Sequence, residues 1–309
     1  MNTNSPSSTP QSHLSKVFVT GDLNIDNMIT GVALGKITRV PYIPPVVGGS
    51  AYNAAVAFKH AGFHPIVFGK IGDDDGGDLI LSALERQGID YLIDRDNAKP
   101  TGTCNIIYFR GEEYPRTIYY WSANANDYNT ESLQLALKKA DLSEDDFIFS
   151  SLHLYDQTDG DLDHCRAFFA ELRSSGSRVI VDIVPHTIYD IFDVAVLKDI
   201  ISGSVFMMIG EYRTFMNLIA VGAYADDRTP TQADCEQIAR HLEAEYFLCR
   251  YGIGNISREL VFRRTHEAVK LLWTAETGYE HLPDVEKRGF GDYLTASTLS
   301  QIVHSRELV

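Results

Sequence analysis

The stretch Val17-Phe18-Val19-Thr20-Gly21-Asp22-Leu23-Asn24-Ile25-Asp26 joins a short apolar run to a glycine and a group of polar residues. Apolar runs of about four to eight residues are typical of strands that are buried on both faces of a parallel sheet. In open α/β sheets, ligands bind outside the carboxyl ends of the strands. We therefore interpret Val17–Thr20 as a core strand and the polar residues after it as part of a candidate ligand site.

Similar apolar runs recur along the chain and alternate with segments of helical period. The further strand candidates are Pro65–Phe68, Phe147–Phe149, Val179–Ile183, Val205–Ile209 and Tyr246–Leu248. The helix candidates are Ser50–Ala61, Gly77–Gln87, Glu131–Ala140, Leu162–Ser174, Thr231–Ala244 (with Thr229 as a predicted N-cap) and Tyr293–Ser305. Such alternation predicts an α/β fold, a doubly wound, mostly parallel sheet with helices on both faces.

Two stretches interrupt this alternation with strand-like patterns, namely Met28–Pro45 and Thr101–Trp121. The second has alternating residues on both sides of Gly111, which is typical of a hairpin. Two β insertions from one domain can pair into a small sheet, and a sheet over the edge of the main sheet is a natural lid. We expect one domain over residues 17–309 with lid segments at 28–45 and 101–121. Residues 1–16 are rich in Ser, Asn, Thr and Pro and are expected to form a loose tail.

The composition argues against several classes of function. The 309 residues include 27 Lys and Arg against 42 Asp and Glu, a net charge of −15, whereas nucleic-acid binding needs clustered basic side chains. No apolar segment approaches the roughly 20 residues of a membrane span. Four scattered cysteines and the lack of a secretory pattern favour the cytoplasm. We expect neither nucleic acid nor a membrane as a partner, and a small anionic ligand would have to be held by local dipoles.

The first candidate site lies directly after the first strand. Because side chains alternate along an extended chain, Asn24 and Asp26 are expected to project to the same side. An amide and a carboxylate can together hydrogen-bond neighbouring hydroxyl groups of a ligand. The alternative is a polar turn with a local cap.

The second candidate site is Gly48-Gly49, which precedes the helix candidate that carries Asn53. Glycines before a helix let a ligand approach the free N–H groups of the first turn. Asn53 lies near that first turn, so we expect it to share a pocket with Asp26. The alternative is a tight turn without a ligand.

The third candidate site is Gly289-Phe290-Gly291-Asp292, which leads into the last helical segment. Successive N–H groups at a helix N-terminus bind anions. A carboxylate beside them can remove a proton from an attacking hydroxyl group. The alternative is that Asp292 only complements the helix dipole. No cluster indicates a protein-held metal, because the acids Asp73–Asp75 are more typical of a turn and an N-cap.

Together these segments resemble the ribokinase-like (PfkB) family of carbohydrate and nucleoside kinases. GDLNID (21–26) is similar to the opening substrate segment of the family, and GGSAYN (48–53) to its glycine pair followed by Asn. VEKRGFGD (285–292) is similar to its C-terminal signature. FGKIGDDDG (68–76) and Thr101-Gly102-Thr103 also lie where family members carry a GxxGDDxxG motif and the start of a lid strand.

The resemblance implies ATP-dependent phosphoryl transfer to a hydroxyl group of a small sugar or nucleoside, with Mg²⁺ bound together with the nucleotide. It implies that Asp292 is the general base and that the backbone N–H groups of Gly289, Phe290 and Gly291 form an anion hole. The residues that it assigns to the substrate hydroxyls are Asn24, Asp26, Gly49 and Asn53, with Gly48 beside them. A homodimer through the lid would cover any apolar face that the lid exposes.

The sequence departs from the family pattern in the segments assigned to the nucleotide. Glu286-Lys287-Arg288 replaces the usual Asp-Thr-Thr, and Phe290 replaces a small residue inside the anion hole. Only Glu211 remains of an Asn-x-x-Glu motif. The remaining nucleotide-contact candidates are Glu211, Arg288, Tyr251 and Gly252. These departures motivate an alternative function, a catalytically silent member that binds a sugar or nucleoside or regulates a partner.

Overall fold

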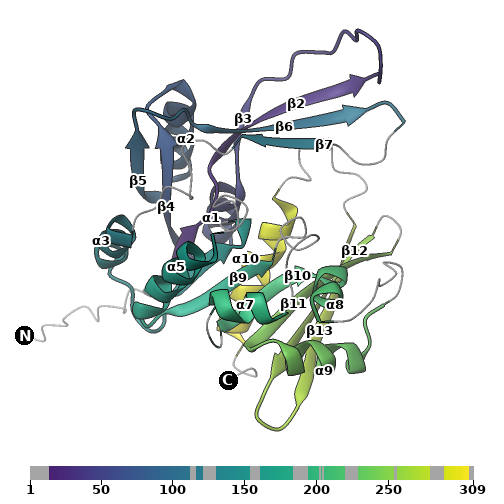
Figure 1. Cartoon of the computed structure of the whole chain (residues 1–309). Helices are drawn as coiled ribbons and strands as arrows, with labels where there is room; N and C mark the ends of the chain where they lie inside the picture. The colour runs from purple at the N-terminus through teal and green to yellow at the C-terminus, as the bar shows by residue number, and fades with distance from the viewer. Residues whose placement is uncertain are drawn as a thin grey trace, which may run out of the picture.

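The computed structural model describes residues 14–111, 116–120, 130–153, 161–183, 194–201, 203, 205–219, 229–253, 256–278 and 289–305. In this part of the chain the strands form two sheets, one of nine strands and one of four (Figure 1). Within the same residues, no helix is both long and apolar enough to span a membrane.

The nine-stranded sheet is mostly parallel, as predicted. Its strand order is β13-β12-β11-β10-β9-β8-β1-β4-β5. Its parallel strands are β1 (Lys16–Thr20), β4 (His64–Gly72), β5 (Asp90–Asp96), β8 (Phe147–Ser151), β9 (Arg178–Ile183), β10 (Val205–Glu211) and β11 (Ala244–Ile253). The edge strands β12 (Ile256–Arg264) and β13 (Val269–Gly278) pair antiparallel. The strands β5, β12 and β13 were not predicted, because charged residues interrupt their apolar patterns.

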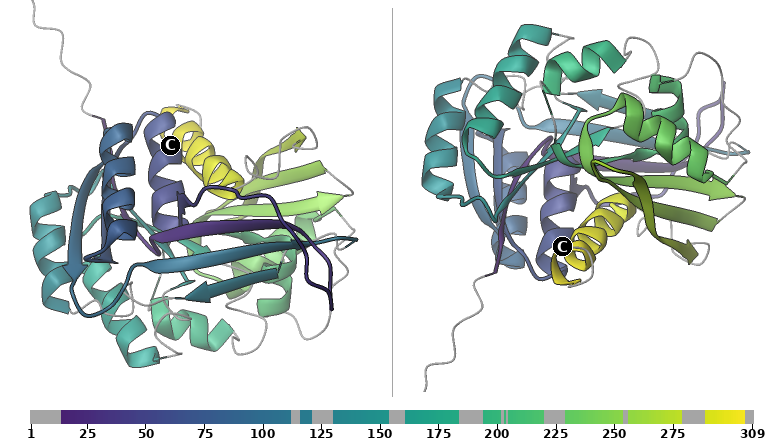
Figure 2. Two further views of the ribbon diagram at one scale, coloured as in Figure 1. Left: turned by 90° about the horizontal axis from the view of Figure 1, so that it is seen from above. Right: turned by 90° about the horizontal axis from the view of Figure 1, so that it is seen from below.

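Helices cover both faces of this sheet (Figure 2). One face packs against α1 (Ser50–His60), α2 (Asp75–Gln87) and α10 (Phe290–His304). The other packs against α3 (Thr130–Ala140), α5 (Leu162–Ser174), α7 (Val194–Ile201), α8 (Tyr212–Ile219) and α9 (Gln232–His241). Alternation along β1 explains the two cores, because Val17 and Val19 belong to one apolar cluster and Phe18 to the other.

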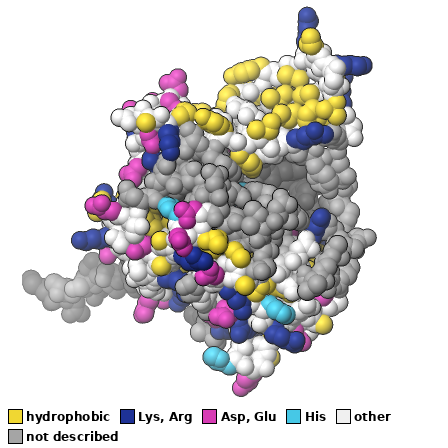
Figure 3. Space-filling view, in the orientation of Figure 1, with side chains coloured by type: hydrophobic (Ala, Val, Ile, Leu, Met, Phe, Trp, Pro, Cys, Tyr) yellow, Lys and Arg dark blue, Asp and Glu magenta, His cyan; other side chains and the backbone are white. Residues whose placement is uncertain are grey.

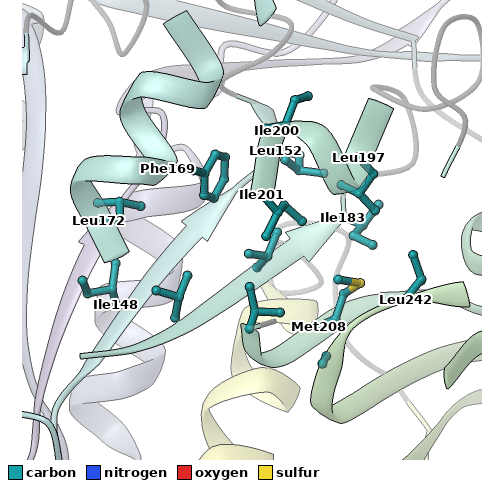
Figure 4. Packing of buried hydrophobic residues seen from close by; sticks show 14 of the residues in the cluster. Ile148, Leu152, Phe169, Leu172, Ile183, Leu197, Ile200, Ile201, Met208 and Leu242 are labelled. Atoms are coloured by element: carbon teal, nitrogen blue, oxygen red, sulfur yellow. The ribbon is translucent and has the colours of Figure 1, made fainter. Parts of the chain in front are cut away.

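On the second face, an apolar cluster packs the helices against the sheet (Figure 4). In the close-up, Ile148 of the sheet lies near Leu172 of α5, Ile183 lies near Leu197 of α7, and Met208 lies near Leu242. Burying each such side chain contributes about 1.5 to 3 kcal/mol to folding. This core holds the strands in place, so that their carboxyl ends form a rigid edge.

The four-stranded sheet is the small second sheet that the two insertions predicted. Its order is β3-β2-β6-β7, with β2 (Asn24–Val32), β3 (Val46–Gly48), β6 (Gly102–Phe109) and β7 (Arg116–Tyr120). The predicted start at Met28 was wrong, because β2 begins at Asn24 and pairs there with Gly102. Residues 33–45 contain no strand. Figure 1 shows this sheet projecting beyond the main domain.

The small sheet is attached to the domain through Thr101. The Thr101 hydroxyl donates to Asp74 Oδ1 at 2.6 Å, and Thr101 N–H donates to Asp74 Oδ2 at 2.8 Å. The amide of Gly72 donates to the Thr101 hydroxyl at 3.0 Å. Asp74 is also the N-cap of α2 and accepts from Gly77 N–H, as its sequence position predicted. Asp74 and Thr101 together therefore join β4, α2 and the start of β6.

Several predicted boundaries move, and three of these changes concern helix caps or the chain start. Thr231, and not Thr229, is the N-cap of α9, because its hydroxyl and the Asp234 side chain form the capping box. Helix α10 begins at Phe290 rather than Tyr293, with Gly289 as its left-handed N-cap. Strand β1 begins at Lys16, inside the predicted tail, while residues 1–13 lie outside the described residues. Asp292 is therefore in the first turn of α10 rather than before the helix.

Candidate functional site

A cavity of about 320 Å³ lies between the carboxyl edge of the main sheet, the small sheet, and the starts of α1 and α10. Its size is in the range of small-molecule sites, which begin at about 300 Å³. Its lining residues come from nearly every part of the chain: Asp22, Asn24, Asp26, Gly49, Ser50, Asn53, Cys104, Ile106, Tyr119, His153, Asp182, Arg250, Gly289, Gly291 and Asp292. The cavity lies where a ligand site was expected for an open α/β sheet.

Asp22 organises the entrance to α1. Its Oδ1 accepts from Ser50 N–H at 3.0 Å and from the Ser50 hydroxyl in a short hydrogen bond. Its Oδ2 accepts from the Asn24 amide at 2.7 Å. The preceding residue, Gly21, carries no side chain, and this leaves room for Ser50, because a Cβ at position 21 would lie 2.3 Å from Ser50 Oγ. Asp22 thus orients Asn24 and satisfies a free N–H group of the helix N-terminus.

Asn24 and Asp26 both line the cavity, as alternation along β2 predicted. Asp26 is only 7% exposed. A Cβ on Gly48 would lie 2.1 Å from Asp26 Oδ2, so the carboxylate packs directly over that glycine. Gly48 therefore leaves the space that the Asp26 carboxylate occupies. Gly48 is not itself among the residues that line the cavity. The polar turn that we considered as an alternative is instead a paired strand.

Gly49 and Asn53 bring α1 to the same cavity. Gly49 has φ 94°, and a Cβ there would lie 2.3 Å from Asp22 O, so no other residue fits without strain. Asn53 contacts the start of α10, because a Cβ on Gly289 would lie 3.2 Å from Asn53 Cβ. The expectation that Asp26 and Asn53 share one pocket is confirmed.

Asp292 lies in the first turn of α10 and lines the cavity together with Gly289 and Gly291. Burial, and then the neighbouring carboxylate of Asp182, raise the pKa of Asp292 to about 8, while Arg250 opposes the shift. A carboxyl group with such a pKa can exchange a proton near neutral pH.

Three charged or polar residues of the cavity lie outside the candidate site segments and the lid, and they were not predicted. Arg250 of β11 forms an ion pair with Asp182 of β9, with Nη2 3.3 Å from Oδ1. Burial raises the pKa of Asp182, which Arg250 and His153 oppose. His153 follows β8 and is 7% exposed. A signal was present, because Asp182 and Arg250 are charged residues inside apolar strands, where charge is rarely buried without a partner or a function.

The small sheet contributes an aromatic and apolar wall. Tyr119 of β7 and Cys104 and Ile106 of β6 line the cavity. The ring centroids of Tyr119 and His153 are 6.2 Å apart. This pair brings β7 of the small sheet together with the end of β8 in the main sheet.

The residues predicted to contact the nucleotide, where the structure describes them, lie in separate elements and do not line the cavity. Glu211 ends β10, is exposed, and does not line the cavity. Tyr251 and Gly252 were expected in a loop but lie in the paired end of β11. Arg288 and the side chain of Phe290 lie outside the described residues. Among the residues that the structure describes, no group of three His, Cys, Asp or Glu is arranged to hold a metal ion.

Solved structures of kinases share this fold. The chain superimposes on ribokinase from Giardia lamblia with a TM-score of 0.67 at 17% identity, covering 96% of this chain and 85% of the other. For Trypanosoma brucei brucei adenosine kinase the TM-score is 0.65 at 16% identity, with 96% and 95% covered. For Arabidopsis thaliana ribokinase complexed with ribose and ATP it is 0.65 at 15% identity, with 96% and 88% covered. These likenesses establish the ribokinase-like fold.

Sequence comparisons identify the family. The bifunctional protein HldE of Chromohalobacter salexigens is 26% identical over 181 residues, which cover 55% of this chain and 36% of that protein. The 2-dehydro-3-deoxygluconokinase of Thermoproteus tenax is 31% identical over 103 residues, 31% of this chain and 30% of the other. The chain thus spans about a third of the length of these relatives. The family model of the pfkB carbohydrate kinases matches residues 14–194, and the chain therefore belongs to the pfkB family of carbohydrate kinases.

Proposed function

We propose that this protein transfers the γ-phosphoryl group of ATP to a hydroxyl group of a small sugar or nucleoside. The observation that carries the proposal is the position of Asp292, a carboxylate at the start of a helix, in the same cavity as Asn24, Asp26 and Asn53. Phosphoryl transfer requires a proton acceptor, an anion site and hydroxyl-binding groups, and a carboxylate, helix N–H groups and polar side chains suited to these three tasks lie together in this cavity.

The substrate side of the cavity suits hydroxyl groups. The carboxylate of Asp26 accepts hydrogen bonds, and the amides of Asn24 and Asn53 both donate and accept. Each hydrogen bond to a charged group contributes about 1.5 to 3 kcal/mol. A polyhydroxylated ring can satisfy several of these groups at once, whereas an apolar ligand would leave them desolvated and unpaired.

The transfer itself needs one proton acceptor. As the substrate oxygen forms its bond to the γ-phosphorus, the bond from that phosphorus to the β,γ-bridging oxygen breaks, and its electron pair leaves with ADP. Asp292 takes the proton of the attacking hydroxyl group. The N–H groups at Gly289 to Gly291 face the negative charge of the phosphoryl group in transit.

ATP is the expected phosphoryl donor for a member of this family, and Mg²⁺ would arrive bound to its phosphates. Asp182 and Asp292 line the cavity, and their carboxylate oxygens are donors of the kind that Mg²⁺ takes, so they would hold the nucleotide-bound metal directly or through its waters. The metal would neutralise charge on the phosphates, while the protein supplies position and the proton acceptor.

The test is a panel of sugars and nucleosides incubated with Mg-ATP, with ADP release as the measurement and product mass as confirmation. We expect one chemical class to stimulate ADP release and to raise the melting temperature by mass action. A protein that is stabilised by a sugar or nucleoside but not by Mg-ATP, and that releases no ADP with any compound, would be the catalytically silent member instead.

The outer surface of the small sheet exposes apolar side chains (Figure 3). Ile118 and Tyr120 of β7 are 57% and 58% exposed, and Ile37 and Tyr42 are also exposed. Exposed apolar patches of this kind are typical of protein contacts. We propose that a second copy of this chain covers them, and that light scattering will show a dimer that Ile118→Glu weakens.

A further inference from the structure

The cavity is strongly acidic. Four of its lining residues are carboxylates: Asp22, Asp26, Asp182 and Asp292. Among the described residues that line it, Arg250 is the only Lys or Arg. A transferring phosphoryl group carries negative charge, so any of these carboxylates that is ionised would repel it without a cation close by. The expectation that backbone dipoles alone would hold an anion here is therefore incomplete.

The guanidinium of Arg250 lies against the start of α10. A Cβ on Gly291 would lie only 1.9 Å from Arg250 Nη1, so the glycine leaves the space that the guanidinium occupies. A cation at a helix N-terminus faces the positive end of the helix dipole, which is unfavourable. The ion pair with Asp182, at 3.3 Å, is long for a charge-assisted hydrogen bond and does not require contact with Gly291.

Other carboxylates balance the charge of Arg250, but they do not accept hydrogen bonds from all of its N–H groups. Arg250 lowers the pKa of Glu259 and of Asp292, in each case against a larger rise from burial. Glu259 lies opposite Arg250 in the β11–β12 pair and is 6% exposed. A guanidinium has five N–H donors, and the described structure shows one hydrogen bond from it, to Asp182.

From this geometry we infer that Arg250 is a further catalytic residue, whose guanidinium binds the oxygens of the transferring phosphoryl group beside the N–H groups of Gly289 to Gly291. The inference rests on the proposed kinase function. Helix N–H groups and the guanidinium are all donors that converge on one point, and an anion at that point resolves the unfavourable contact between them. Asp182 then serves as a positioning residue that holds Arg250.

The test compares binding of Mg-ATP and Mg-ADP by calorimetry in wild type and in Arg250→Met, which keeps the apolar stem and removes the charge. We expect affinity for Mg-ATP to fall roughly 10- to 150-fold, the weight of a charged hydrogen bond, while affinity for Mg-ADP falls less than about threefold. Arg250→Lys should restore part of the ATP affinity, because it keeps the charge but loses the planar fork.

Arg263→Met is the matched control. Arg263 lies on β12, is partly buried, and forms an ion pair with Glu245 at 2.8 Å. It does not line the cavity, so its loss should leave the ratio of ATP to ADP affinity unchanged. Gly291→Ala is a second route to the same effect, because the new Cβ displaces the guanidinium without removing its charge. It keeps the inference testable if Arg250→Met does not fold.

The outcomes separate the inference from the function on which it rests. Suppose that the wild type phosphorylates a sugar or nucleoside, and that Arg250→Met and Gly291→Ala bind ATP and ADP as the wild type does. This result overturns the role of Arg250 alone. Tighter ATP binding in Arg250→Met also overturns it, because Arg250 would then obstruct the site. A wild type that binds no ATP overturns the proposed function and the inference together.

Discussion

Replacing Asp292 by Asn removes the proposed proton acceptor and keeps the shape of the side chain. Asp292 is in the first turn of α10, and its carboxyl group has a pKa of about 8 instead of 3.8. Burial is the main cause, and Asp182 adds to it. The charge of Asp292 is therefore unfavourable in the folded protein, and the substitution should have opposite effects on activity and stability.

The magnitude follows from proton linkage. A carboxyl group whose folded pKa is raised stabilises the fold most below its unfolded pKa of 3.8, and this stability is lost as the pH rises towards 8. The full shift corresponds to about 4 kcal/mol at pH 7 and about 2 kcal/mol near pH 5. Asp292 lines a cavity, and solvent there would screen part of the effect. We expect Asp292→Asn to stabilise the protein by about 2 to 4 kcal/mol at pH 7 and by less near pH 5.

Two assays measure these effects. Urea unfolding across this pH range gives the free energy of unfolding of both proteins. Steady-state turnover with Mg-ATP and the best acceptor from the panel gives the catalytic effect, a loss of roughly 10² to 10⁴-fold in Asp292→Asn. Wild-type kcat/KM should rise with pH until Asp292 is ionised, near pH 8. The residual rate of Asp292→Asn should lack this rise.

Asp75→Asn is the matched control, because Asp75 is also in the first turn of a helix but is exposed. It should leave turnover unchanged and cost only about 0.3 to 1 kcal/mol of stability through the helix dipole. The reasoning about Asp292 would be refuted by an Asn variant with wild-type turnover. A variant whose turnover still rises with pH as in wild type would also refute it.

Three further substitutions test the cavity and its support. Asp26→Ala should weaken acceptor binding roughly 10- to 150-fold through loss of charged hydrogen bonds, and an unchanged dissociation constant in calorimetry would remove Asp26 from the substrate site. Gly49→Ala should destabilise the fold by roughly 2 kcal/mol or more in urea unfolding, because its φ of 94° and the 2.3 Å approach to Asp22 O leave no room for a Cβ. Thr101→Val should cost about 1 to 3 kcal/mol, because it leaves Asp74 Oδ1 and the Gly72 amide without their hydroxyl partner; an unchanged melting temperature would show that this contact does not hold the small sheet.

Local patterns were sufficient to predict most of the main sheet. Val17–Thr20 and Val179–Ile183 were recognisable as strands because both of their faces are buried, which leaves a continuous apolar run. Helix α5 was predicted with the correct bounds, and its C-terminal glycine lies just beyond it. The edge strand β5 was missed because one of its sides meets solvent, so that charged residues break the pattern.

The residues of the cavity also fall into those that a local pattern predicted and those that depend on contacts between elements. Asn24, Asp26, Asn53 and Asp292 were predicted because each follows a strand or begins a helix, where the chain itself exposes polar groups to a ligand. The pairing of Asp26 with the Gly48 surface was not visible, because it depends on how β2 and β3 pair.

The sequence by itself determined the α/β class, the edge of the sheet at which a ligand would bind, and the three segments that lead to it, because these follow from residues close together in the chain. Only the tertiary structure decided that Asp182, Arg250 and Gly291 meet. Parallel strands and a distant helix bring these residues together, and contacts over such separations leave no local pattern in the sequence. The charge of the cavity, and with it the pKa of Asp292, therefore depends on packing between elements and not on any one motif.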